Sequence, residues 1–225
     1  MRQFKDISCF YNTYKDKPIV VLGTGPGLDY WLQDKQYQYK DYSIITINRA
    51  CRFAAPTFAF FDTPISVHAC IENLSSCQNI CLPIFSLKEI SLNSIIVQEY
   101  LERIYFYVWD YKGWGKLTHR MFDYTSANQK LNFWSLFVEN GNVQSIAVFC
   151  KLLGCSKIIF FGCDGHGVGT DRLYAKVFRE ENQKLIGRKQ IRQQHKYNLS
   201  YEGLLKVLKL IGIDYEFSKI PSSYY

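Results

Sequence analysis

The chain has 225 residues, of which 48% are hydrophobic and 21% charged, a balance that excludes a disordered chain and allows a large core. We expect one catalytic domain over residues 1–225, since α/β folds of this length commonly stay undivided. The formal net charge is +7. The positive charge belongs to residues 111–225, with 17 basic and 9 acidic groups, whereas residues 1–110 have 10 and 11. No apolar run approaches the roughly 20 residues that cross a bilayer.

Apolar runs that alternate with helical patterns predict an α/β fold with a mostly parallel, Rossmann-like sheet flanked by helices. The predicted strands are residues 18–22, 43–48, 57–61, 79–84, 104–109, 157–161 and 213–217. Apolar residues at helical spacing predict a helix over Asn142–Leu153, which Gly154 ends. Ligands of such sheets bind beyond the carboxyl ends of the strands.

Glycines follow the first predicted strand, at Gly23, Gly25 and Gly27. Glycine lets the backbone turn sharply and approach a phosphate at the start of a helix. The G-x-G-x-G spacing, and Asn48 instead of an acid after the second strand, argue against a dinucleotide, and the lack of Gly-Lys-Ser/Thr excludes a Walker loop. A glycine turn without a ligand stays open as the alternative.

Two weakly periodic segments, residues 110–140 and 165–198, are predicted to be long connections suited to close over the site as lids. The second contains a basic run without an intervening acid: Lys184, Arg188, Lys189, Arg192 and Lys196. Such a run suits a phosphate-bearing donor, an anionic acceptor, a membrane surface or nucleic acid. A solvated helix face is the alternative.

Eight cysteines without a leading signal peptide indicate thiols in a reducing compartment, so we expect a cytoplasmic protein, with peripheral membrane contact as an open alternative. Two sets of residues could in principle hold a metal. The spacing of His68, Cys70, Cys77 and Cys81 matches no common zinc site, and Asp62, Asp164 and His166 are scattered. We therefore expect no metal and no cofactor.

Several motifs fall at equivalent places, each after a strand or before a helix. They are Gly23-Thr-Gly-Pro-Gly-Leu28, Ile47-Asn-Arg49, Phe60-Phe-Asp-Thr-Pro64, Asn140-Gly-Asn142, Gly162-Cys-Asp164 and His195-Lys-Tyr-Asn198. The set resembles the bacterial sialyltransferases of glycosyltransferase family 42 and the related DUF115 group. Departures include Thr24 in place of the family asparagine, Gly27 in place of serine, and no counterpart for the acceptor-side arginine.

The resemblance implies a variant GT-A, inverting glycosyltransferase that needs no metal. It makes His195 the general base, with Tyr174 and Arg172 assisting departure of the phosphate. It further implies a set of residues that surround the donor: Gly23, Thr24, Gly25, Pro26, Gly27, Asn48, Asp62, Thr63, Asn142, Gly162, Asp164 and His166.

The implied partners are a nucleotide-sugar donor, as co-substrate, and a glycan or other anionic acceptor. The donor is expected to be CMP-linked and to carry sialic acid or a related sugar. Two alternatives stay open: a Mg²⁺-dependent pterin or nucleotide pyrophosphokinase of the DUF115 kind, and a protein that binds or glycosylates nucleic acid through residues 184–196. A homo-oligomer is also left open.

Overall fold

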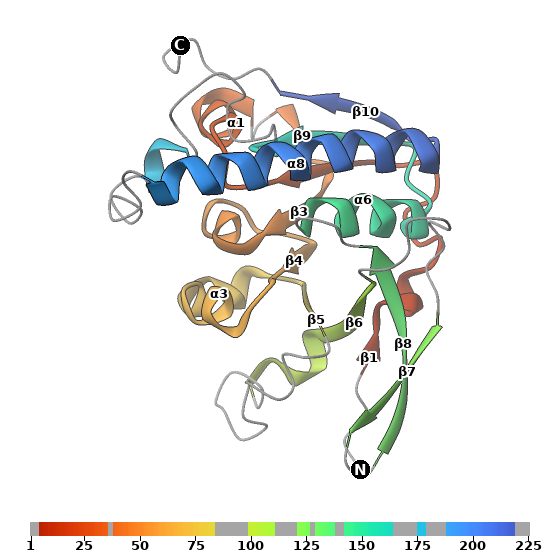
Figure 1. Ribbon diagram of the computed structural model, residues 1–225. Coiled ribbons are helices and arrows are strands. Elements are labelled where there is room, and N and C mark those ends of the chain that lie inside the picture. The colour runs from red at the N-terminus through yellow and green to blue at the C-terminus, as the bar shows by residue number, and fades with distance from the viewer. Residues whose placement is uncertain are drawn as a thin grey trace.

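The computed structural model describes residues 5–35, 38–83, 99–110, 121–126, 129–137, 142–163, 175–178 and 188–218. Within them, ten strands form a sheet with the order β10-β9-β2-β3-β4-β5-β6-β8-β7, and β1 pairs with β6 beside β8 (Figure 1). The strands are β1 (Lys5–Asp6), β2 (Pro18–Leu22), β3 (Ser43–Ile47), β4 (Phe58–Phe60), β5 (Asn79–Pro83), β6 (Ile104–Asp110), β7 (Met121–Ser126), β8 (Gln129–Phe137), β9 (Lys157–Phe161) and β10 (Asp214–Phe217). Every pairing is parallel except that of β7 with β8, which confirms the predicted mostly parallel α/β sheet.

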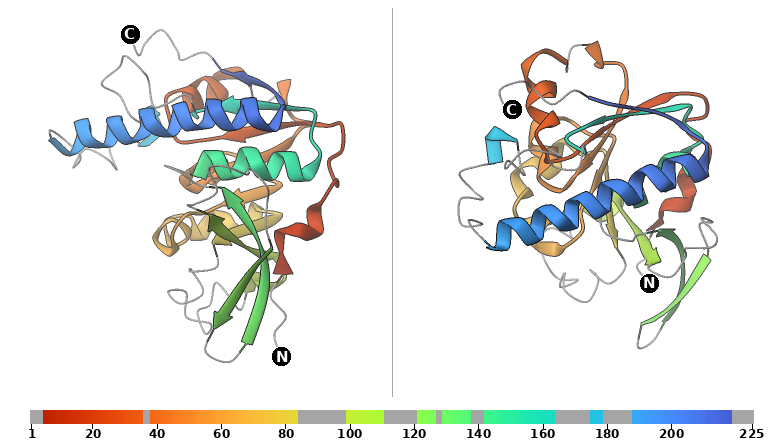
Figure 2. Two further views of the ribbon diagram at one scale, coloured as in Figure 1. Left: turned by 45° about the vertical axis from the view of Figure 1, so that its right-hand side comes forward. Right: turned by 45° about the horizontal axis from the view of Figure 1, so that its top comes forward.

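Helices cover both faces of the sheet. The α-helices are α1 (Gly27–Tyr30), α3 (Pro64–His68), α6 (Asn142–Leu153) and α8 (Arg188–Ile211). Shorter turns are η1 (Ile7–Phe10), η2 (Trp31–Lys35, π-helical), η3 (Asn48–Phe53), η4 (Ile71–Ser76), η5 (Leu101–Arg103) and η6 (Lys176–Phe178). α6 and α8 run side by side on one face, whereas α1 and η2 pack on the other (Figures 1 and 2). Among the described helices, none has both the length and the apolar run needed to cross a bilayer.

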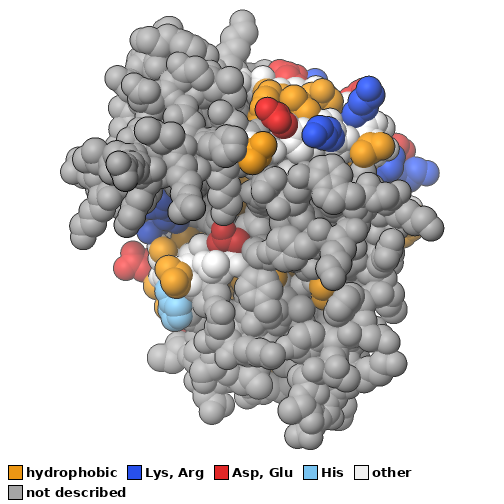
Figure 3. Space-filling view, in the orientation of Figure 1, with side chains coloured by type: hydrophobic (Ala, Val, Ile, Leu, Met, Phe, Trp, Pro, Cys, Tyr) orange, Lys and Arg blue, Asp and Glu red, His pale blue; other side chains and the backbone are white. Residues whose placement is uncertain are grey.

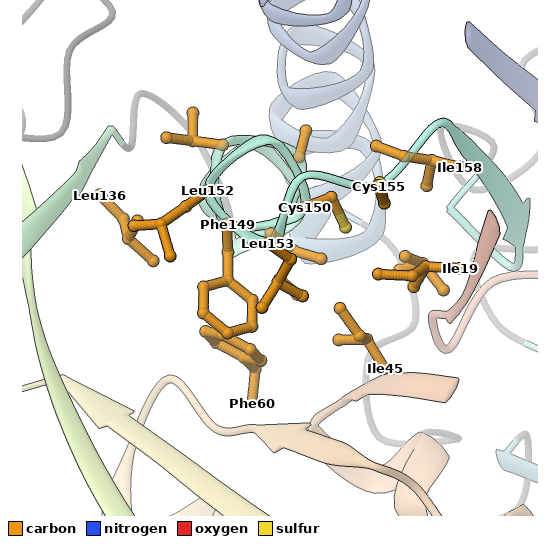
Figure 4. Close-up of a cluster of buried hydrophobic side chains, with 14 of the residues drawn as sticks. Ile19, Ile45, Phe60, Leu136, Phe149, Cys150, Leu152, Leu153, Cys155 and Ile158 are labelled. Atoms are coloured by element: carbon orange, nitrogen blue, oxygen red, sulfur yellow. The ribbon is translucent and has the colours of Figure 1, made fainter. Parts of the chain in front are cut away.

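The two-sided cover explains why the central strands are apolar throughout. In β2, Ile19 and Val21 face the α6 layer, while Val20 and Leu22 face the α1 layer, and all four are fully buried. Phe149 of α6 points down onto the sheet, with its ring 5.0 Å from that of Phe60 (Figure 4). Burying a side chain of this size stabilises the fold by roughly 1.5–3 kcal/mol.

The predicted connection over residues 110–140 contains two strands that sequence reasoning missed. β7 and β8 form an antiparallel hairpin, and residues 135–137 of β8 extend the sheet beside residues 108–110 of β6. The hairpin extends away from the helices, toward the N-terminus of the chain (Figures 1 and 2). Its aromatic residues and threonine favour a strand, but its apolar residues do not alternate cleanly with polar ones.

The basic run also differs from the expected loop, because α8 begins at Arg188 rather than near Leu204. Lysine, arginine and glutamine are good helix formers, and residues 188–198 contain neither glycine nor proline. Since few of these residues are apolar, they leave no helical period to detect. Lid roles for residues 110–140 and 165–198, and the single domain, stay predictions.

Candidate functional site at the carboxyl edge of the sheet

The glycine loop, residues 23–27, lies between β2 and α1 and packs directly on the turn that follows β9. The Gly23 N–H donates to the Phe161 carbonyl at 2.7 Å, and the Gly25 N–H donates to the Gly162 carbonyl at 2.9 Å. A Cβ on Gly23 would lie 2.8 Å from Cys163 Sγ, closer than real Cβ contacts. Gly162 has φ +67°, which favours glycine. The absence of a side chain at Gly23 and Gly162 therefore lets the two loops pack closely against each other, whether or not a ligand approaches them.

The two loops flank the place where the strand order reverses. From β2 the chain continues toward β3, whereas from β9 it continues toward β10 on the other side. Ligands of open α/β sheets bind in the crevice at such a switch point. Among the described residues, the N–H groups of Thr24 and Gly27 have no hydrogen-bond acceptor. Both N–H groups lie at the start of α1, beside this switch point.

Residues 175–178 lie against this loop. The Ala175 N–H donates to the Thr24 carbonyl at 3.0 Å, and the Lys176 N–H donates to both carboxylate oxygens of Asp29, at 3.0 and 2.9 Å. The side chain of Asp29 is only 5% exposed. Sequence reasoning gave Asp29 no role, although an acid in the first helical turn after a glycine loop was a visible signal. The Asp29 carboxylate holds residues 175–178 against the predicted donor loop.

Asn48 joins the ends of two neighbouring strands. It follows β3 in the left-handed conformation, with φ 50°, which asparagine adopts more readily than most residues. Its side-chain carbonyl, Oδ1, accepts a hydrogen bond from the Asp62 N–H at 3.1 Å. The Nδ2 group of Asn48 has no partner among the described residues, so it can donate to a ligand. The next residue, Arg49, was missed; its guanidinium lies 4.8 Å from the Phe178 ring centroid.

The two candidates after β4, Asp62 and Thr63, differ in the hydrogen bonds that their side-chain oxygens already make. Thr63 caps α3, because its hydroxyl accepts a hydrogen bond from the Ser66 N–H at 3.3 Å. Asp62 Oδ1 accepts from the Ser66 hydroxyl at 2.8 Å. The second carboxylate oxygen of Asp62 has no partner among the described residues, whereas the Thr63 hydroxyl already has a structural partner.

Asn142, the first residue of α6, has the clearest unmet hydrogen-bonding group of the site. Its side chain is 8% exposed, and its Nδ2 is buried without a partner in the part of the chain that the structure describes. Leaving a buried donor unpaired costs about 1–3 kcal/mol, so such groups are uncommon unless a ligand or water completes them. The structure therefore singles out one residue from the predicted donor set.

The position of His195 follows from the contact of α8 with α6. Gln144 Nε2 donates to the Ser200 carbonyl at 3.1 Å, so Ser200 lies near the start of α6. His195 precedes Ser200 by five residues, or about 7.5 Å along the helix axis. Figure 1 shows α8 extending past α6 on the side where α3 also lies. The backbone of His195 is thus on the overhanging part of α8, while its side chain lies outside the described residues.

Four other predicted site residues, Arg172, Tyr174, Asp164 and His166, also lie outside the described residues. The described candidates form two contacting pairs of loops, residues 23–27 with Gly162 and Asn48 with Asp62. Figure 3 shows acidic, basic and histidine side chains together on the α3 side of the molecule. Within the described ranges, no three His, Cys, Asp or Glu side chains are placed to hold a metal ion. His68, Cys70, Cys77 and Cys81 therefore form no zinc site.

Comparison with known proteins gives structural matches at low sequence identity. No family model matches the chain, and no curated protein matches it. The MAf glycosyltransferase from Magnetospirillum magneticum AMB-1 is 15% identical over 73% of this chain, with a TM-score of 0.47. This chain spans about a quarter (25%) of the length of that protein. The sialyltransferase CstII from Campylobacter jejuni, solved with the substrate analogue cytidine-5'-monophosphate, is 13% identical over 91% of this chain and 80% of its own, with a TM-score of 0.46.

Proposed function

We propose that the chain is an inverting glycosyltransferase that takes a sugar from a CMP-linked donor bound at the carboxyl edge of the sheet. The observation that supports this most directly is the buried Nδ2 of Asn142, which has no hydrogen-bond partner among the described residues. The N–H groups of Thr24 and Gly27 and the Nδ2 of Asn48 likewise have no acceptor among the described residues. All of these are donors, so they suit a ligand rich in acceptors, such as phosphate, ribose or a pyrimidine carbonyl.

In the proposed reaction, the acceptor hydroxyl attacks the anomeric carbon while the bond from that carbon to the nucleotide phosphate breaks. His195 removes the hydroxyl proton, a role that imidazole can fill because its unperturbed pKa is about 6.5. Tyr174 and Arg172 stabilise the negative charge that grows on the departing phosphate. These three roles come from the resemblance described above.

The acceptor is proposed to be a glycan or another anionic molecule. The overhanging start of α8 carries Arg188, Lys189, Arg192 and Lys196, and it follows Lys184. Positive charge there raises the local concentration of an anionic acceptor, and the effect falls with ionic strength. Membrane and nucleic-acid surfaces present the same chemistry, so competition by acidic lipid vesicles or by RNA distinguishes them from a glycan.

Binding of nucleotides tests the proposal. Calorimetry against CMP, UDP, GDP and ATP is expected to show CMP binding, and CMP at 100 times its Kd is expected to stabilise the fold by about 2.7 kcal/mol. Binding of ATP or UDP at millimolar concentration without binding of CMP would contradict the donor assignment. Once turnover is found, its loss on addition of EDTA would favour a Mg²⁺-dependent pyrophosphokinase instead.

A further inference from the structure

Three thiols that the proposed reaction does not use meet beneath the outer turns of the sheet. Cys51 lies in η3, Cys70 directly follows α3, and Cys77 follows η4. They are 1%, 1% and 0% exposed and belong to one apolar cluster. η3 packs against both α3 and η4, and the Cys51 side chain forms thiol hydrogen bonds with Cys70 and Cys77, so its sulfur lies next to both of theirs. Three separate turns of the chain thus place their sulfurs together.

The pKa values of the three thiols are shifted in different directions. The hydrogen bond from Cys51 lowers the pKa of Cys70, and the guanidinium groups of Arg52 and Arg49 lower it further, against the opposing effect of burial. Hydrogen bonding from Cys51 likewise lowers the pKa of Cys77. The same hydrogen bonds, together with burial, raise the pKa of Cys51. A nucleophilic sulfur and a thiol that can complete a disulfide therefore lie side by side.

Cys70 is also the member of the cluster that contacts the proposed donor site. Its thiol donates to the backbone carbonyl of Asn48 at 3.9 Å, whereas the Cys77 thiol donates to the Asn73 carbonyl at 3.5 Å, on η4. Cys51 lies three residues after Asn48, within the same short turn. Any bond between Cys51 and Cys70 therefore acts on the backbone that carries Asn48.

We propose that Cys51 and Cys70 are a thiol oxidation site that forms a reversible disulfide and links η3 to the end of α3 beside Asn48. The oxidant is a low-molecular-weight disulfide such as oxidised glutathione. The Cys70 thiolate attacks one sulfur of that disulfide, forming a mixed disulfide and releasing one glutathione thiolate. Cys51 then attacks the Cys70 sulfur, its proton passes to the second glutathione thiolate as it leaves, and two protein thiols have been oxidised while one glutathione disulfide has become two thiols.

Access to the buried sulfurs requires a local opening, and the chain over them is suited to it. Ala69, Ile71 and Glu72 are exposed, and this part of the chain consists of short turns held by local hydrogen bonds. Such segments open at much lower free energy than the central strands. Opening of residues 69–76 would bring Cys70 and Cys77 to solvent without disturbing β2, β3 or β9.

A peptide map of the oxidised 225-residue chain tests the disulfide independently of any activity. The protein is equilibrated with oxidised glutathione, remaining thiols are blocked with N-ethylmaleimide, and trypsin is added without reductant. The expected product joins residues 50–52, which contain Cys51, to residues 53–88, with the loss of two hydrogen atoms. Reduction with dithiothreitol is expected to separate the two peptides.

Serine variants identify the partner. Cys51→Ser and Cys70→Ser are expected to abolish the linked peptide, while Cys77→Ser and the control Cys155→Ser retain it. A linked peptide that persists in Cys70→Ser, or stable glutathione adducts without any link in the wild type, would overturn the proposal. Fragmentation of the linked wild-type peptide shows which of Cys70, Cys77 and Cys81 is joined to Cys51, so the pairing is decided even if a variant folds poorly.

The regulatory consequence rests on the proposed function and is tested separately. Because the Cys70 thiol can no longer donate to Asn48 once it is in a disulfide, we expect oxidation to weaken CMP binding about tenfold, with recovery in dithiothreitol and no effect in Cys70→Ser. Unchanged CMP affinity in a chain that carries the disulfide would refute this consequence. If neither the reduced nor the oxidised chain binds CMP, the donor assignment fails while the peptide map still decides on the disulfide.

Discussion

Replacing the buried amide of Asn142 is expected to affect stability and ligand binding in opposite directions. We predict that Asn142→Leu raises the free energy of unfolding of the ligand-free protein by about 1–3 kcal/mol, because an apolar group replaces a buried donor that has no partner in the described part of the chain. The same variant is expected to weaken CMP binding at least tenfold. Urea unfolding and calorimetry measure the two effects.

Asn73→Leu is the matched control, since Asn73 is half-buried on η4 away from the carboxyl edge. It is expected to leave CMP affinity unchanged. A loss of stability in Asn142→Leu would show that the amide nitrogen already has a partner, such as an ordered water, in the ligand-free protein.

A second prediction at this scale concerns His195. His195→Ala is expected to lower single-turnover transfer by about 10² to 10⁴, because a general base acts on the acceptor proton in the transition state. Donor affinity should change little, since His195 lies on α8 and the glycine loop lies after β2. The control is His68→Ala, an exposed histidine on α3. Transfer within threefold of the wild type would exclude His195 as the base.

At the scale of elements, the contact between the β2 and β9 loops explains two glycines without reference to a ligand. A Cβ at Gly162 would lie 2.7 Å from the Gly23 carbonyl oxygen, and Gly162 also has φ +67°. Gly212, after α8, has a similar φ of +60°, but a Cβ there would meet no atom within 4 Å. A side chain at either glycine would have to adopt the unfavourable left-handed conformation. Only a side chain at Gly162 would also clash with neighbouring atoms.

We accordingly predict that Gly212→Ala lowers the free energy of unfolding by about 1–2 kcal/mol, the cost of placing alanine in the left-handed region. Gly162→Ala is expected to cost more than Gly212→Ala, because the loops must also move apart. Urea unfolding of both variants measures the difference. Equal losses would mean that the loops accommodate a methyl group, and that their close approach contributes little.

At the scale of the whole molecule, the sequence predicted the central sheet well and its periphery poorly. β2 and β9 have the predicted bounds, because continuous apolar runs between glycines and turns indicate doubly buried strands. The β7–β8 hairpin and the first half of α8 lack an apolar period, since they lie at the edge of the core. Their identity depends on long-range pairing and on intrinsic propensity, which periodicity does not report.

The candidate site also has features that could be predicted from the sequence and features that could not. Motif positions predicted that residues 23–27, Asn48, Asp62 and Gly162 lie at the carboxyl edge, because this edge follows from the direction of parallel strands. The capping role of Thr63 and the anchoring role of Asp29 depend on contacts with Ser66 and with residues far along the chain. Such contacts become visible only after folding, and so does the burial of the Asn142 amide nitrogen without a partner among the described residues.

The pH dependence of folding is a property of the whole core, and two fully buried thiols contribute to its alkaline side. Burial raises the pKa of Cys81 and of Cys150 well above the ordinary value of 9.0. Both thiols stay protonated in the folded protein and ionise in the unfolded chain, so their contribution to stability is complete below pH 9 and is lost as the pH rises further. At pH 10, ionisation of each thiol in the unfolded chain is expected to lower the free energy of unfolding by about 1.4 kcal/mol.

Urea unfolding at pH 7 and pH 10 of the wild type, Cys81→Ala and Cys150→Ala measures this contribution of the thiols. Each variant loses packing at both pH values, but its additional loss between pH 7 and pH 10 should be smaller than that of the wild type by the contribution of one thiol. An identical pH dependence in all three proteins would show that neither thiol ionises on unfolding in this range.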